Sequence, residues 1–166
     1  MTLHLVGGRS PHGLRATRDR TARRNLLLYS LGQKADFPGY RAVHDAGVLS
    51  DFSTSEGGKA LVRVSRWAGA AEIDQLIAWG ADPNYLDPDI GYAALHRAIF
   101  GNNLAGLKEL LARGADPLER SKNGRLPSEL TGTPEDTKRA EILALVEKAA
   151  KQRSMQPTTH RSAGTP

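Results

Sequence analysis

Two stretches of the chain share one pattern: Gly80-Ala81-Asp82-Pro83-Asn84 recurs as Gly114-Ala115-Asp116-Pro117-Leu118. Stretches that resemble each other at a fixed separation along the chain, here called the repeat offset, are typical of repeat architectures. We therefore expect successive units at residues 57–90 and 91–123, with a third, shorter unit opening at Gly124. Other positions separated by the same offset agree in character: Gly57 with Gly91, Leu61 with Leu95, Val64 with Ala98, Ile73 with Leu107, Leu76 with Leu110 and Ile77 with Leu111.

Each unit has the spacing of two short helices followed by a turn. Leu95, Ala98 and Ile99 would share one face of a first helix, and the leucines between residues 104 and 111 would share one face of a second. Gly114 suits the residue that follows a helix end. The Asp-Pro step after it disfavours further helix. Because neither helix can bury its apolar face alone, neighbouring units must stack.

The sequence of residues 91–98 (GYAALHRA), the Leu110-Leu111 pair and the motif Gly114-Ala115-Asp116-Pro117 resemble the ankyrin repeat. The resemblance covers about residues 57–150, although Ala93-Ala94 replace the Thr-Pro usual in the family. It implies an all-α solenoid of helix-turn-helix units that binds a partner protein through its concave face. It also implies a protein that is not an enzyme and needs no cofactor.

The flanking segments differ from the repeats. Residues 25–56 are expected to form an irregular N-terminal cap, with a short helix over 25–31. An eroded repeat is one interpretation of this cap, because residues 39–46 (GYRAVHDA) match residues 91–98 at five of eight positions. Residues 124–150 are expected to be a C-terminal capping unit, whose last helix starts near Thr133 and Pro134. Residues 1–24 and 151–166 have little to bury and are expected to be disordered tails.

The net charge of +5 is located in these tails. Residues 1–24 carry +5 and residues 151–166 carry +3, which leaves −3 for residues 25–150. The basic character of the chain therefore does not describe the repeats. The Arg-rich start has three interpretations: a solvated tail, an arm that binds nucleic acid or another anionic surface, or an organelle transit peptide. The chain has no cysteine, no apolar run that could span a bilayer and no secretory signal, so we expect a cytoplasmic protein.

No pattern in the sequence indicates catalysis or metal binding. His44 and His96 stand singly, without a second histidine at ligand spacing, so we interpret them as structural hydrogen-bonding residues. Gly57-Gly58-Lys59 is only a fragment of a phosphate-binding loop, and we interpret it as a loop that enters a helix.

The resemblance predicts a partner-binding surface made of turn tips and of the exposed side of each first helix. Aromatic and arginine side chains at these positions are typical of binding hot spots. Two alternatives stay open: an inhibitor or immunity-type protein that blocks a partner enzyme or toxin, and a nucleic-acid-associated protein that acts through its Arg-rich arm. The candidate residues are Arg66, Trp67, Tyr85, Asp89, Ile90, Tyr92, Phe100, Lys122, Asn123 and Arg125.

Overall fold

The computed structural model describes residues 36–47, 55–130 and 137–155, and all regular structure in these ranges is helical. The predicted all-α fold of helix-turn-helix units is thus confirmed for the described ranges. None of the helices there is long and apolar enough to cross a membrane. The elements are α2 (Phe37–Asp45), α3 (Ser55–Val64), α4 (Ala70–Ala78), α5 (Ala94–Phe100), α6 (Leu104–Ala112), the 3-10 helix η1 (Pro127–Leu130) and α7 (Thr137–Met155).

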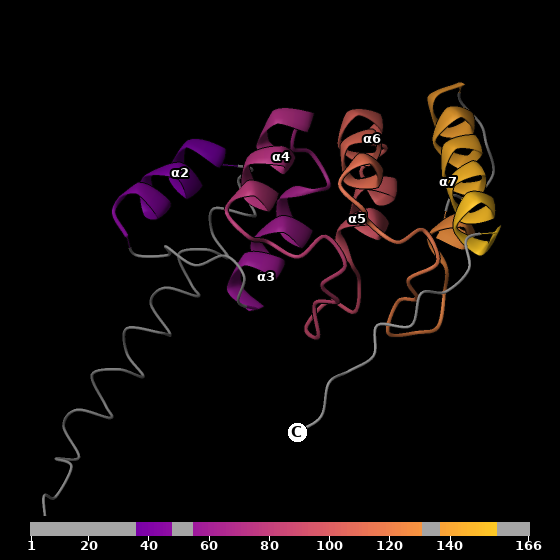
Figure 1. The fold of residues 1–166 in the computed structure, drawn as a ribbon, viewed down its shortest axis with the longest axis horizontal. Coiled ribbons are helices and arrows are strands. Elements are labelled where there is room, and N and C mark those ends of the chain that lie inside the picture. The colour runs from indigo at the N-terminus through magenta and orange to yellow at the C-terminus, as the bar shows by residue number, and fades with distance from the viewer. Residues whose placement is uncertain (1–35, 48–54, 131–136, 156–166) are drawn as a thin grey trace, which may run out of the picture.

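The helices lie in two rows (Figure 1). α4, α6 and α7 form one row, and α3 and α5 form the other, with the loops after α4 and α6 projecting from the side of α3 and α5. Contacts join α3 to α4 and α5 to α6 within each unit, and α3 to α5 and α4 to α6 between units. The apolar positions that recur from unit to unit fill the space between the rows. Leu61, Ile73, Leu76, Leu95, Leu107 and Leu110 are all at most 2% exposed.

The second helices of the two units match residue for residue, because α6 begins and ends at the repeat offset from the ends of α4. Each is followed by a glycine with positive φ, +107° at Gly80 and +87° at Gly114, as predicted for Gly114. The N-terminus of α6 also ties the units together. The Asn103 side chain caps it by accepting a hydrogen bond from Gly106 N at 3.0 Å. The same side chain donates to the carbonyl oxygens of Ser65 and Ala68 at 3.0 and 2.7 Å.

The glycines that are paired by the repeat, Gly57 and Gly91, differ in conformation. Gly57 and Gly58 are buried inside α3, which already begins at Ser55, whereas Gly91 lies in a turn with φ +73°, three residues before α5. The interpretation of Gly57-Gly58-Lys59 as a loop is therefore wrong. A Cβ atom at Gly58 would overlap the ring of Tyr85. Gly58 therefore serves close packing, and Gly91 serves a turn.

The described part of the N-terminal segment is the single helix α2. Asp36 caps it by accepting a hydrogen bond from Gly39 N at 2.9 Å. Gly39 is thus helical, so the likeness of residues 39–46 to residues 91–98 does not extend to the backbone. α2 lies against the end of α4, where the ring of Trp79 stacks on His44 and Phe37, with ring centroids 4.0 and 6.1 Å apart. The predicted helix over 25–31 lies outside the described residues.

At the other end, η1 and α7 pack on the last complete unit. The long helix α7 contacts α6 and η1 and buries Ile142 and Val146. It continues to Met155, so the prediction of a disordered tail from residue 151 is wrong for residues 151–155. Neither Gly nor Pro interrupts residues 137–155, and the helix runs on with an exposed last turn. The predicted cap at Thr133 and Pro134 lies outside the described residues, as do residues 1–24 and 156–166.

Candidate protein-binding face

The first helices of the two units carry side-chain stripes at matching positions, basic on α3 and formed by an arginine and a phenylalanine on α5. Lys59, Arg63 and Arg66 follow each other at spacings of four and three residues, which places them on one side of α3 and its last turn. Arg97 and Phe100 occupy the positions in the second unit that Arg63 and Arg66 occupy in the first. Because α3 contacts α5, the two stripes lie next to each other. We call this surface the first-helix face, and it comprises Lys59, Arg63, Arg66, Trp67, Arg97 and Phe100.

Two large apolar side chains of this face are exposed, Trp67 at 39% and Phe100 at 38%. Tyr92 presents its ring edge-on to Phe100, with centroids 5.0 Å apart, and is itself partly buried against the core. Of the aromatic residues predicted for the binding surface, Tyr92 and Phe100 therefore lie in contact. Trp67 corresponds to Gly101 rather than to Phe100 in the repeat, and no described residue places a ring against it.

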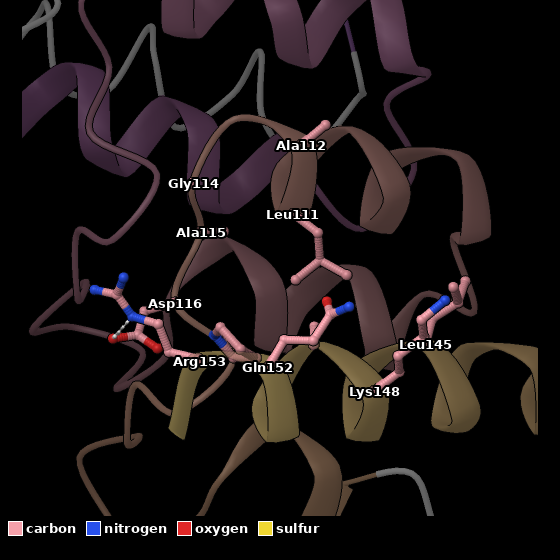
Figure 2. A pocket seen from close by; sticks show the side chains of 11 residues that line it. Leu111, Ala112, Gly114, Ala115, Asp116, Leu145, Lys148, Gln152 and Arg153 are labelled. Atoms are coloured by element: carbon pink, nitrogen blue, oxygen red, sulfur yellow. Dashed lines mark ion pairs between the residues drawn. The ribbon is translucent and has the colours of Figure 1, made fainter. Parts of the chain in front are cut away.

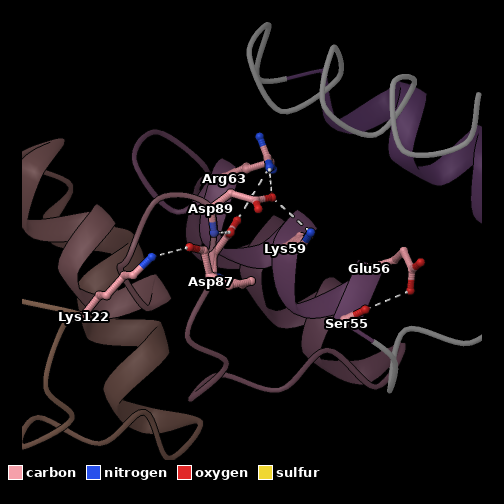
Figure 3. Close-up of polar contacts among 8 residues, drawn as sticks. Ser55, Glu56, Lys59, Arg63, Asp87, Asp89 and Lys122 are labelled. Carbon is pink, nitrogen blue, oxygen red and sulfur yellow. Dashed lines mark hydrogen bonds and ion pairs between the residues drawn. The ribbon is translucent and has the colours of Figure 1, made fainter. Parts of the chain in front are cut away.

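An ion-pair network joins the face to the loop between the two units (Figure 3). The carboxylate of Asp87 is fully buried and lies 3.6 Å from a guanidinium nitrogen of Arg63. Asp89 is exposed and pairs with Lys59 at 3.1 Å and with Arg63 at 3.9 Å. The hydrogen bond that Lys59 donates to Asp89 raises the pKa of Lys59. Of this network, the sequence prediction included only Asp89. The sequence feature that could have indicated this network is a pair of basic residues one helical turn apart, Lys59 and Arg63. Two aspartates, Asp87 and Asp89, follow in the loop between the units.

The next loop holds three further predicted residues. Lys122 is hydrogen-bonded to the preceding loop: its backbone N–H donates to Gly91 O at 2.9 Å, and its ammonium donates to Pro88 O at 3.3 Å. The guanidinium of Arg125 donates to Glu129 O at 2.8 Å. Asn123 is exposed. The two loops therefore stand side by side as one edge of the face.

Tyr85 and Ile90, like Tyr92, are partly buried and pack against the core. The ring of Tyr85 lies over Gly58, and burial raises its pKa. These two side chains therefore support the loop from behind rather than offering a free surface.

Arg66 and Arg97 have no carboxylate partner among the described residues, and the Nε atom of Arg97 is buried without a hydrogen-bond partner. Burial lowers the pKa of Arg97, and the positive charges of Arg66 and Arg63 lower it further. The face thus holds arginines that repel each other beside exposed aromatic rings.

His96 makes the structural hydrogen bonds expected from the sequence. Its Nδ1 accepts from Ala93 N, and its Nε2 donates to Arg125 O in the next unit, both at 3.3 Å. Its side chain is fully buried, and burial lowers its pKa below the ordinary 6.5. Both nitrogens are therefore used by the fold. Within the described ranges, no three His, Asp or Glu side chains are grouped so that they could hold a metal ion.

An open cleft of about 530 Å³ lies between α6 and α7 (Figure 2). Leu111, Ala115 and Leu145 contribute its apolar lining. At one end Arg153 lies 4.0 Å from the carboxylate of Asp116. The cleft belongs to the row of second helices and so is separate from the first-helix face.

Comparison with known proteins gives partial matches. No family model matches the chain. The 2-5A-dependent ribonuclease of Mus musculus is 30% identical over 96 residues, which cover 49% of this chain and 13% of that protein. Oxysterol-binding protein homolog 1 of Saccharomyces cerevisiae is 32% identical over 90 residues, which cover 49% of this chain and 8% of that protein. The chain thus spans a small part of either relative. Matches of similar length to two proteins with such different names indicate a shared structural module rather than a shared activity.

Proposed function

We propose that this chain is a short ankyrin-type repeat array that binds a partner protein through the first-helix face. This face takes the role of the concave surface implied by the resemblance. In this proposal the chain acts by recognition alone, without catalysis and without a cofactor.

The observation that carries the proposal is the composition of the first-helix face. Exposed Trp67 and Phe100 stand beside Arg66 and Arg97, and aromatic and arginine side chains are those that dominate the energy of protein interfaces. Lys122, Asn123 and Arg125 supply a polar rim on the neighbouring loop. Two further features support the proposal: the helix-turn-helix fold, and the module-sized matches to two proteins with different names.

The test compares variants of the full-length tagged chain in affinity purification from its native cell, followed by measurement of Kd for the captured partner. Phe100→Ala and Trp67→Ala should each weaken binding by about 1–3 kcal/mol while the melting temperature stays unchanged. Met155→Ala removes a side chain that is 74% exposed on α7, and it is the matched control.

One result would contradict the proposal: binding that persists in a Trp67→Ala/Phe100→Ala double variant but disappears when residues 1–24 are removed. The Arg-rich arm would then be the functional part. A steep fall of affinity with salt would mark its ligand as a nucleic acid. Assay of the captured partner's activity, with and without this chain, would separate an inhibitor from a scaffold.

A further inference from the structure

Two arginines of the first-helix face lack the ion pairs that Lys59 and Arg63 make on the same face. On the row of second helices, Arg113 pairs with Asp74 and Glu109, and Lys108 pairs with Glu141 at 2.8 Å. On the first-helix face, Arg66 and Arg97 have no such partner among the described residues. The repeat region as a whole is not short of acid, since residues 25–150 carry a net charge of −3. The unpaired arginines are therefore a local feature of one face.

The backbone brings these two arginines together. Gly101 N donates to Arg97 O at 3.0 Å, so Gly101 lies one turn beyond Arg97 on α5. A Cβ atom at Gly101 would overlap the carbonyl oxygen of Arg66, so the end of α5 rests directly on the end of α3. The arginines are consequently held side by side by the packing of two adjacent units. Phe100 lies between Arg97 and Gly101 in the chain, next to the ring of Tyr92.

We propose that the segment recognised by this face is an acidic peptide, whose carboxylates pair with Arg66 and Arg97 and whose apolar side chain packs against Phe100 and Trp67. A planar guanidinium binds a carboxylate through two parallel hydrogen bonds. Charge complementarity thus selects the partner's chemistry, and the aromatic rings supply the apolar contact. This inference rests on the proposed function and deepens it.

The test is selection of random 12-residue peptides by the full-length chain, followed by fluorescence-anisotropy titration of the peptides selected. Selected sequences should be enriched in Asp and Glu and should contain an aromatic or aliphatic residue. Replacing their Asp and Glu by Asn and Gln should weaken binding at least about tenfold, as expected for the loss of hydrogen bonds between charged groups. Arg66→Gln/Arg97→Gln should cause a similar loss.

The matched control is Lys108→Gln/Lys148→Gln, which removes two positive charges from exposed positions on α6 and α7. This variant should bind the acidic peptides as the wild type does, whereas a general effect of net charge would weaken both double variants equally. Thermal unfolding of each variant confirms that the fold is kept. Arg66→Lys/Arg97→Lys keeps the charge but not the paired hydrogen bonds, and its affinity should lie between those of the wild type and the Gln variant.

Three outcomes overturn the inference, and they separate it from the proposed function. If the selected peptides lack acidic residues but still require Phe100, the face binds proteins and the acidic partner is wrong. If the peptides bind Phe100→Ala and Arg66→Gln/Arg97→Gln as tightly as the wild type, both the inference and the proposed function fail. If a labelled 20-nucleotide single strand binds the wild type and is lost in Arg66→Gln/Arg97→Gln, the arginines serve phosphates and the partner is a nucleic acid.

Discussion

Arg97 stands at the position in the second unit that Arg63 holds in the first, yet only Arg63 lies within ion-pair distance of the buried carboxylate of Asp87, although the charge of Asp87 also acts on Arg97. Arg63→Gln should therefore destabilise the fold by about 2–4 kcal/mol, because it leaves a buried charge unpaired. Arg97→Gln breaks no ion pair and should cost less than Arg63→Gln, about 1 kcal/mol of the free energy of unfolding or less. Urea unfolding of both variants checks this difference. Equal losses would show that the two arginines have the same structural role.

Leu110 is fully buried in α6 at the centre of the array. Leu110→Ala should lower the free energy of unfolding by about 2–5 kcal/mol, the range for a core leucine. Because the array has so few units, we expect a single cooperative transition at lower denaturant rather than the loss of one repeat. Leu118→Ala, at a leucine that is 37% exposed, is the control and should cost much less. A loss below about 1 kcal/mol at Leu110 would show that the repeat register is wrong.

Gly101 is the point where α5 rests on the backbone of Arg66. Gly101→Ala should cost about 1–3 kcal/mol, because the new methyl group meets a carbonyl oxygen rather than a mobile side chain. Gly69→Ala is the comparison, since its Cβ would meet only the end of the Glu72 carboxylate. Thermal unfolding of the two variants should therefore separate them clearly. Similar melting temperatures would mean that the units have room to move apart.

His96 should make stability fall in mild acid. Its pKa is lower in the folded chain than its ordinary 6.5, so the unfolded chain takes up the proton first as the pH falls. The contribution of His96 is complete above pH 6.5 and declines below it, by at most about 1.4 kcal/mol per pH unit for one proton. Urea unfolding between about pH 7.5 and 5.5 should show a steeper decline in the wild type than in His96→Gln. Parallel curves would mean that His96 protonates freely in the fold.

Most of the repeat could be predicted from the sequence because its signals are local. The spacing of apolar residues in 94–112 and the glycine at 114 correctly predict α5, α6 and the turn that follows. Local pattern also predicted that His96 would be structural. These features depend on residues close in the chain, which a single sequence displays directly.

The errors arise where the conformation depends on distant neighbours. Gly57 and Gly91 are the same residue type at the repeat offset, but one is helical and the other has positive φ. The ion pair of Arg63 with Asp87 joins residues on different elements, so the spacing of the basic residues on α3 does not by itself show which carboxylate they contact. In the candidate site, exposure at Trp67 and Phe100 agrees with the prediction. The burial of Tyr85 and Ile90 behind the loop could not be foreseen without knowing what packs beside them.

The loop at residues 87–91 is one residue longer than its counterpart, since Gly91 N reaches back four residues to Asp87 O and Gly124 N reaches back only three to Ser121 O. Its longer tip is tethered on one side by Lys59 and on the other by Lys122. A partner that docks here meets a surface that is already ordered. This loop then loses little conformational entropy when the partner binds. A larger share of the interaction energy therefore appears as affinity, even for a modest contact area.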